Sequence, residues 1–238
     1  MILLALDTCD SRGSLAILRD GEVLKSIAHE GTSEYSSWLL PNVDLALAAS
    51  RLGIGDVDVF AVAAGPGSFT GVRMGLATVK AWSEALGKGI ASVSRLEAMA
   101  AEAVAGNEYV AASFDAHRDQ VYGGLFLRQG TGFVLVEEEM AAAPGDFIAW
   151  VSHRAQKERV SWISLDPEKL TAAEAWQSRA AAGERVETST IVLAPVIGRI
   201  GRQRALDGHL TDALRLDAQY VRRPDAEVFW KGAASRAR

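Results

Sequence analysis

Short apolar runs alternate along the first half of the chain with segments whose apolar residues recur at helical spacing. Continuous apolar runs predict strands buried on both faces. Apolar residues three and four positions apart predict amphipathic helices. The resulting order is three strands, a helix, a strand, a helix and a short strand. The expected strands are 2–6, 14–18, 23–28, 57–64 and 90–93, and the expected helices are 34–52 and 72–86.

Turn and cap residues mark the ends of these elements. Asp20-Gly21 has the composition of a hairpin turn. Pro41 is expected to kink the first helix or to mark a late start, and Gly53 to close it. Ser94 followed by Glu97 predicts a capping box that opens a further helix.

The second half repeats the same order. Its first strand, like that of the first half, ends at an aspartate: Asp7 in one half and Asp115 in the other. Pro195 suits the first turn of a final helix that ends at Leu206. The expected strands are 109–114, 121–128, 133–136 and 160–165, with helices around 147–153 and 167–181.

This internal repeat predicts an α/β fold of two duplicated βββαβα lobes. The actin, Hsp70 and sugar-kinase superfamily has this architecture, with a nucleotide cleft between its lobes. We expect an N-terminal actin-like lobe over 1–105, which holds the partner-binding helices and a glycine-rich loop. A second, reduced actin-like lobe is expected over 106–212 and a basic C-terminal tail over 213–238.

Composition narrows the setting in which the protein works. No apolar run approaches the roughly 20 residues that span a bilayer. The segment Met1–Asp7 has no basic leader and reaches a carboxylate early, so we expect a cytoplasmic protein that is neither exported nor bound to a membrane. A single cysteine, Cys9, excludes an internal disulfide and a cysteine-based zinc cage.

The charge of the chain is negative overall but uneven. A net charge of −5 argues against a protein that binds nucleic acid by itself. Residues 199–238 nevertheless hold nine Lys or Arg against five Asp or Glu. This basic end is either a solvated helix and tail or a surface that faces phosphate.

A glycine-rich segment between an expected strand and an expected helix is the first candidate site. Amides at a helix N-terminus and glycines that admit a ligand closely both favour a bound anion. The segment is not a P-loop, because Val72 and Arg73 follow the second glycine of that pattern. The alternative is a tight turn capped by Thr70, with Arg73 as a surface cation. The candidate phosphate or nucleotide residues here are Gly65, Gly67, Ser68, Thr70, Gly71 and Arg73.

The ends of the two first strands are the second place for chemistry. Asp7 and Thr8, with the turn at Gly13-Ser14, could form a small corner that holds a phosphate or a metal-bound water. It is equally consistent with the sequence that Asp7 bonds to nearby turn amides. Asp115 occupies the equivalent point of the second half, where kinases of the superfamily place acidic groups.

Other catalytic patterns are absent from the sequence. The four histidines, His29, His117, His153 and His209, lack the helical spacing of metal ligands. Ser68 does not lie in a GxSxG motif, so no activated nucleophile is visible. We expect no catalytic residues, no metal and no cofactor.

Four segments carry a resemblance to a known family. They are Leu4–Thr8, the run GPGSFTGVR at 65–73, the run DAHRDQVY at 115–122, and Tyr220-Val221-Arg222. Together they resemble the bacterial TsaB family, also called YeaZ, and GPGSFTGxR is highly specific to it. The likeness spans nearly the whole chain and weakens through the middle of the second lobe.

The resemblance implies an actin-like fold and a role in making threonylcarbamoyladenosine. This modified base lies beside the anticodon of tRNAs that read codons beginning with adenine. In the family this subunit is not an enzyme. It forms a heterodimer with the catalytic paralogue TsaD, the ATPase TsaE docks on the pair, and tRNA is met through the complex.

The resemblance also implies that pairing uses the two helices expected at 34–52 and 72–86. Their apolar residues either form this interface or belong to the core of the lobe. Without the paralogue, the same helices could form a homodimer. The candidate interface residues are Trp38, Leu39, Val43, Leu47, Met74, Val79 and Trp82.

Two other functions remain open on the sequence. Asp7, Asp115 and the glycine-rich segment are also compatible with a small actin-like phosphotransferase or ATPase. A metallopeptidase is the third possibility, and the absence of a metal-binding helix disfavours it.

Overall fold

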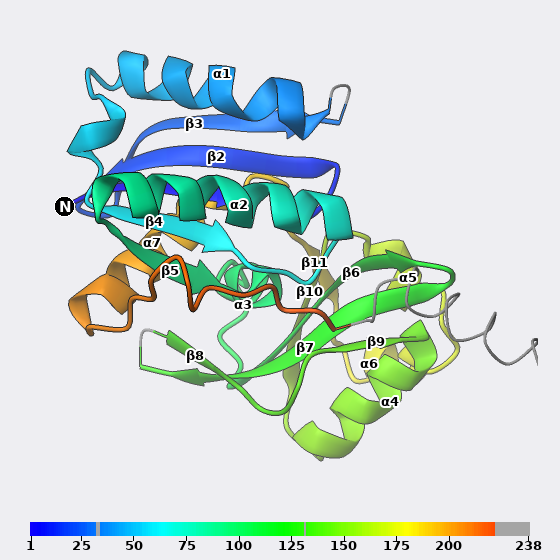
Figure 1. The fold of residues 1–238 in the computed structure, drawn as a ribbon. Helices are drawn as coiled ribbons and strands as arrows, with labels where there is room; N and C mark the ends of the chain where they lie inside the picture. Colours follow the sequence, from blue (N-terminus) through cyan, green and yellow to red (C-terminus); the bar gives the residue numbers. More distant parts are fainter. Residues whose placement is uncertain (32–33, 131, 222–238) are drawn as a thin grey trace, which may run out of the picture.

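The computed structural model describes residues 1–31, 34–130 and 132–221. Two mixed sheets, each with helices packed on it, form the molecule (Figure 1). The first sheet has the order β3-β2-β1-β4-β5, in which β1 is antiparallel to β2 and parallel to β4. Its strands are β1 (Ile2–Asp7), β2 (Arg12–Arg19), β3 (Glu22–Glu30), β4 (Val59–Ala63) and β5 (Gly89–Val93).

The second sheet repeats this arrangement strand for strand. Its order β8-β7-β6-β10-β11 has the same two antiparallel pairs followed by two parallel pairs. The duplication expected from the sequence is therefore confirmed. The strands are β6 (Tyr109–His117), β7 (Gln120–Gln129), β8 (Gly132–Leu135), β10 (Val160–Ser164) and β11 (Val186–Thr188), and β9 (Met140–Ala142) pairs with β7.

Buried apolar runs account for the central strands. From Leu3 to Leu6 every side chain of β1 is buried, because β1 lies between β2 and β4 with helices on both faces of the sheet. The hairpin between β2 and β3 turns at Asp20 and Gly21. Both residues have positive φ, 53° and 94°, as a tight two-residue turn requires.

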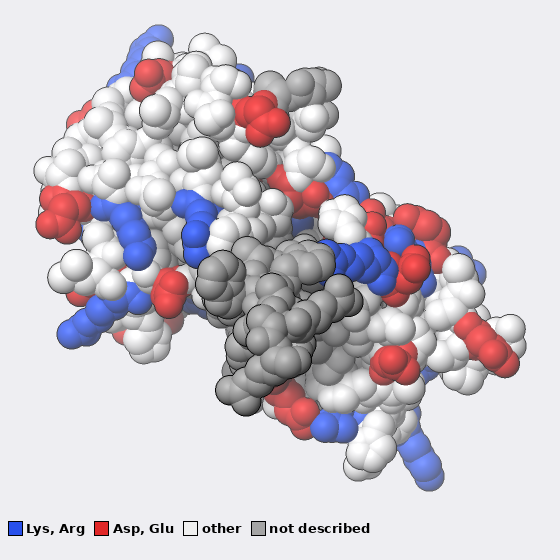
Figure 2. Space-filling view, turned by 45° about the vertical axis from the view of Figure 1, so that its right-hand side comes forward, with Lys and Arg blue, Asp and Glu red and all other residues white. Residues whose placement is uncertain are grey.

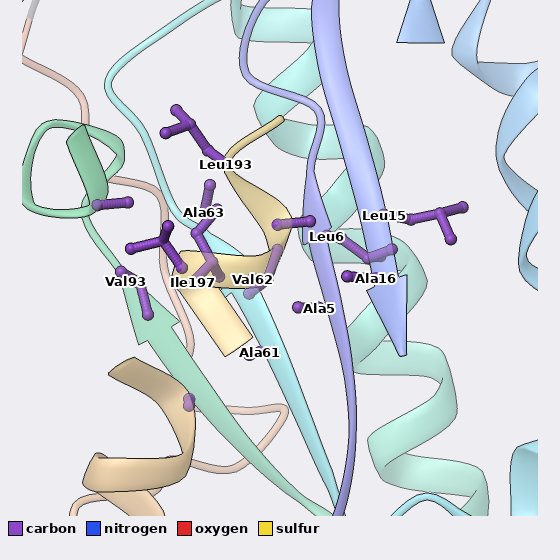
Figure 3. Close-up of a cluster of buried hydrophobic side chains, with 14 of the residues drawn as sticks. Ala5, Leu6, Leu15, Ala16, Ala61, Val62, Ala63, Val93, Leu193 and Ile197 are labelled. Atoms are coloured by element: carbon purple, nitrogen blue, oxygen red, sulfur yellow. The ribbon is translucent and has the colours of Figure 1, made fainter. Parts of the chain in front are cut away.

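Helices α1 (Tyr35–Ala49) and α2 (Phe69–Leu86) cover one face of the first sheet. The other face is covered by α7 (Ala194–Leu206), which comes from the far end of the chain. Two glycines let α7 approach closely: a Cβ on Gly201 would lie 2.7 Å from the Cβ of Ala61, and one on Gly198 would collide with Leu18. Figure 3 shows Ile197 beside Val62 and Val93 in this core.

The two lobes exchange one helix each. Helix α3 (Arg95–Ala100) follows β5 of the first sheet but packs on β6 and β7 of the second. Helix α7 follows the second sheet but packs on the first. The expected lobe of 106–212 is therefore wrong in its last part, because α7 and Thr211, which pairs with Ile90, lie on the first lobe. Most of the expected tail, 222–238, lies outside the described residues.

Several ends and short elements differ from the sequence prediction. Helix α1 runs through Pro41, and Arg51 at φ 55°, rather than Gly53, takes the left-handed position after it. The strands β9 and β11 are only three residues long, too short to produce an apolar pattern.

The expected helix 167–181 is two helices, α5 (Pro167–Thr171) and α6 (Trp176–Ala181). The break brings Trp176 edge-on against Trp162, with ring centroids 5.3 Å apart. Tertiary packing thus overrides a helix-forming sequence. Helix α4 (Pro144–Ala155) completes the second lobe, and a short 3₁₀ turn at Ile54–Asp56 follows α1. Within the described ranges no helix is long and apolar enough to cross a bilayer.

Candidate functional site

The carboxylate at the end of β1 is enclosed by the protein. Asp7 is 0% exposed, and Nε of Arg95 donates to its Oδ2 across 3.1 Å. Its other oxygen accepts from the backbone amide of Cys9 at 3.0 Å. The alternative in which Asp7 bonds to a nearby turn amide is therefore confirmed. A buried carboxylate with a cation beside it has no face left for phosphate or metal.

Arg95 is the residue at this site that sequence reasoning missed. It stands at the first position of α3 and is also 0% exposed. Its second terminal nitrogen donates to the backbone oxygen of Arg12 at 2.9 Å, and its first lies 3.5 Å from Asp10. The only sequence signal was the cap that precedes it: Ser94 does accept from the amides of Leu96 and Glu97. That signal predicts where the helix starts but not where Arg95 points.

The glycines of the candidate loop fit the chain against itself. A Cβ on Gly71 would collide with the backbone oxygen of Thr8, and a Cβ on Gly67 with that of Cys9. The Thr8 hydroxyl donates to the Gly71 oxygen at 2.7 Å, and the Ser68 amide donates to the Cys9 oxygen at 2.6 Å. The backbone at the end of β1 therefore occupies the space beside these glycines where a ligand would otherwise approach.

The start of the loop is covered by the chain near its other end. Gly65, at φ 121°, packs under the backbone of Gln219, whose amide donates to Ala64 at 2.8 Å. Arg73 lies 3.7 Å above the ring of Phe69, and its Nε donates to the Tyr220 hydroxyl at 2.8 Å. Arg73 therefore anchors this C-terminal segment, residues 216–221.

Ser68, not Thr70, is the N-cap of α2. The Ser68 backbone is extended and its Oγ accepts from the Gly71 amide at 3.4 Å, whereas Thr70 is already in the first turn of the helix. The helix starts three residues earlier than expected, because Phe69 and Thr70 continue its apolar and polar pattern without a break.

A pocket of about 280 Å³ lies between the starts of α1 and α2. His29 is almost fully buried beside it and stacks on Tyr35 with centroids 4.3 Å apart. The Tyr35 hydroxyl donates to the backbone oxygen of Asp10 at 2.6 Å. Burial raises the pKa of this phenol far above its usual value. Of the candidate loop residues, the pocket is lined by Thr8, Ser68, Thr70 and Gly71.

Asp115, at the equivalent point of the second lobe, stands in a different environment. Its carboxylate lies 3.4 Å from Nζ of Lys169 and 3.7 Å from Nδ1 of His117. The turn that follows is unusual, since His117, Arg118 and Asp119 all have φ between 54° and 60°. The two first strands therefore do not present a matched pair of acids. Across the described ranges, no group of three His, Cys, Asp or Glu side chains could hold a metal ion.

The expected interface residues divide into two groups. Leu39, Val43, Leu47 and Val79 are at most 4% exposed and belong to the core of the first lobe, so their assignment to an interface is corrected. Trp38, Met74 and Trp82 are partly exposed. Core and surface positions share the same helical spacing, which is why the sequence alone did not separate them.

The outer surface of these two helices exposes apolar side chains, with the exposed Asp44, Arg73 and Glu84 among them. Leu40 and Leu45 of α1 are 54% and 57% exposed. In Figure 2 most of the surface of the first lobe is white, with separate red and blue groups on it. Seven small or apolar residues of α1 and α2 are exposed, and we call them the α1–α2 face: Leu40, Pro41, Leu45, Ala48, Ala77, Ala81 and Ala85.

Comparison with known proteins places this geometry in a family. A family model described as TsaD, tRNA N6-adenosine threonylcarbamoyltransferase, matches residues 22–178. The TsaB protein of Escherichia coli K12, named a tRNA threonylcarbamoyladenosine biosynthesis protein, is 30% identical over 69% of this chain and 71% of its own. Its namesake from Haemophilus influenzae is 28% identical over 97% of this chain and 96% of its own.

Solved structures agree. A protein from Pseudomonas aeruginosa, described as similar to the peptidase YeaZ, superposes with a TM-score of 0.73 at 26% identity, over 93% of this chain and 99% of its own. A ROK hexokinase from Thermus thermophilus has a TM-score of 0.52 at 11% identity, over 86% and 100% of the two chains, and shows the sugar-kinase-like fold alone. The chain therefore belongs to the TsaB (YeaZ) family of tRNA threonylcarbamoyladenosine biosynthesis proteins.

Proposed function

We propose that this chain is a non-catalytic partner subunit in threonylcarbamoyladenosine formation and that it heterodimerises with a TsaD-type transferase. The transferase would hold the reactive centre, and a TsaE-type ATPase would bind to the pair. This complex, rather than the chain alone, would bind tRNA in the cytoplasm. The modified adenosine lies beside the anticodon of tRNAs that read codons beginning with adenine.

The buried pair of Asp7 and Arg95 carries the non-catalytic part of this proposal. A phosphate site or a phosphotransferase that uses Asp7 requires this carboxylate to face a ligand. Here the guanidinium of Arg95 lies at that carboxylate, and both side chains are 0% exposed. Moving either group away would leave an unpaired charge inside the protein, at a cost of several kcal/mol.

The α1–α2 face supports the docking part. Exposed apolar patches of this kind mark interaction sites in soluble proteins. Ala77, Ala81 and Ala85 recur every four residues along α2 and therefore lie on one side of it. Such a row of small side chains lets a partner helix approach closely. In the absence of the transferase, the same face would pair two copies of this chain.

The test is reconstitution of the modification with purified components. The transferase, the ATPase, the threonylcarbamoyl donor and tRNA are combined with and without this chain, and modified adenosine is measured by mass spectrometry. We expect modification only when both the chain and the transferase are present, and a stable complex of the two on gel filtration. Transfer by this chain alone, or full-rate transfer without it, contradicts the proposal.

A small actin-like phosphotransferase or ATPase remains the second candidate. It is favoured by Asp115, which is 24% exposed, and by the position of Lys169 beside it. It predicts ATP hydrolysis by the isolated chain that is lost in Asp115→Asn and retained in the surface control Glu137→Gln. We expect no hydrolysis by any of the three proteins.

A further inference from the structure

Arg12 joins the two lobes at the ends of their strands. Nη1 of Arg12 donates to Oδ1 of Asp166 at 2.9 Å, and its Nη2 donates to Oδ2 at 3.2 Å. Arg12 begins β2 of the first sheet, and Asp166 follows β10 of the second. Two parallel bonds between a guanidinium and a carboxylate fix both distance and orientation. We call this pair the interlobe clasp.

Each half of the clasp is itself held in place. In the first lobe, Arg12 also donates to Asp10 at 2.8 Å, and its backbone oxygen accepts from the buried Arg95. In the second lobe, Asp166 accepts from the Asp115 amide at 2.8 Å, and its own amide donates to Ser164 at 3.0 Å. Neither side chain can change its position without breaking contacts inside its own lobe.

Burial makes the clasp stronger than an ordinary surface ion pair. The side chains of Arg12 and Asp166 are 32% and 15% exposed. Fully exposed pairs contribute little to stability, and partial exclusion of water strengthens the interaction. The exchanged helices α3 and α7 attach the lobes through apolar contacts. The clasp therefore adds a second charged contact to this apolar packing and to the buried pair of Asp7 and Arg95.

Two-lobed proteins that close on a ligand obtain the contacts of the closed state from that ligand. Here the chain's own side chains already make the contacts between the lobes. We propose that the interlobe clasp fixes the angle between the two lobes without any ligand, so that the chain meets its partners as one rigid body.

The distance between two spin labels, one in each lobe, tests this in the full chain. Gln203→Cys on α7, which packs on the first sheet away from the α1–α2 face, and Gln177→Cys on α6 are both exposed. Cys9 does not compete for the label, because it is 0% exposed and burial raises the pKa of its thiol. Pulsed electron paramagnetic resonance then gives the distribution of distances between the lobes.

We expect a narrow distribution in the labelled parent chain that does not change when ATP and Mg²⁺ are added. Asp166→Asn should broaden it and add longer distances. The matched control is Arg154→Gln, since Arg154 forms the same two-bond pair with Glu137 at 2.7 Å and 2.9 Å, is also 32% exposed, and lies within one lobe.

Three results would overturn the proposal: a parent distribution that narrows or shifts with ATP, an Asp166→Asn distribution identical to the parent, or equal broadening in the Arg154→Gln control. Circular dichroism shows whether each variant is folded. If Asp166→Asn does not fold, Arg12→Lys replaces it, because lysine keeps the charge but cannot form both bonds. The same outcomes then apply to it.

Discussion

Arg95 donates to Asp7 across 3.1 Å, and neither side chain is exposed to solvent. The two residues are 88 positions apart in sequence and come from the end of β1 and the start of α3. The pair thus joins the first sheet to the helix that covers the second. It also occupies the end of β1, where the sequence was compatible with a corner that holds phosphate.

Removing one member of this pair should destabilise the protein strongly. We expect Arg95→Met to lower the free energy of unfolding by about 3–5 kcal/mol, because Asp7 is left as an unpaired buried charge. Urea denaturation measures the change. The double variant Asp7→Leu with Arg95→Met should recover much of the loss. A double variant that loses the sum of the two single effects would show that the residues act independently.

The contact between the start of α2 and the end of β1 gives a second prediction. Gly71→Ala should lower the free energy of unfolding by about 2–3 kcal/mol, since the added methyl group meets the backbone oxygen of Thr8. Gly55→Ala is the control, because no heavy atom lies within 4 Å of its Cβ position. Equal effects in thermal or urea unfolding would contradict the packing role of Gly71.

Glu139 makes stability depend on pH in the neutral range. Burial raises its pKa from an ordinary 4.5 to about 7, against the lowering effect of the hydrogen bond from Ser94. The folded state therefore binds a proton that the unfolded state has released. This contribution is fully present below about pH 4.5 and is lost as the pH rises through about 7.

Glu139→Gln should remove that dependence. Between pH 5 and 7.5 we expect the stability difference between the original chain and the variant to shift in favour of the variant as the pH rises. The measurement is urea unfolding at several pH values. A difference that stays constant would mean that Glu139 is ionised throughout the range, and a shift in the opposite direction would mean that its pKa is lower in the folded state than in the unfolded state.

The α1–α2 face predicts which surface changes abolish pairing. Leu45→Glu and Ala81→Glu should each weaken binding to the transferase at least tenfold, or about 1.4 kcal/mol, by burying a charge in an apolar contact. Val104→Glu is the matched control, because Val104 is 90% exposed and lies outside the face. Calorimetric titration measures the affinities, and an equal loss in the control would place the interface elsewhere.

Much of the architecture could be predicted, because apolar runs and turn residues are local signals for strands and hairpins. The apolar run before Asp7 predicts a buried strand, and Asp20-Gly21 predicts the turn between the next two strands; the structure has both. The repeated order of elements then predicts two similar sheets, which the structure contains. The motif at 65–73 likewise points to the family that the comparisons establish.

The contacts that define the site are not local and could not be predicted in this way. An arginine is most often exposed, so nothing near Arg95 indicates that it is buried against a residue 88 positions earlier. The sequence left open whether the glycines at 65–71 admit a ligand or form a tight turn, and the structure packs the chain's own backbone against them. Whether any ligand uses the neighbouring pocket stays a prediction.

The exchange of α3 and α7 has a consequence for the order of folding. During synthesis the first sheet leaves the ribosome with one face uncovered, because the helix that packs on it ends only at Leu206. The N-terminal half cannot mature as an independent unit while the remainder is being translated. Its apolar face stays exposed until nearly the entire polypeptide has been synthesised. Until then it is a target for chaperones and for aggregation.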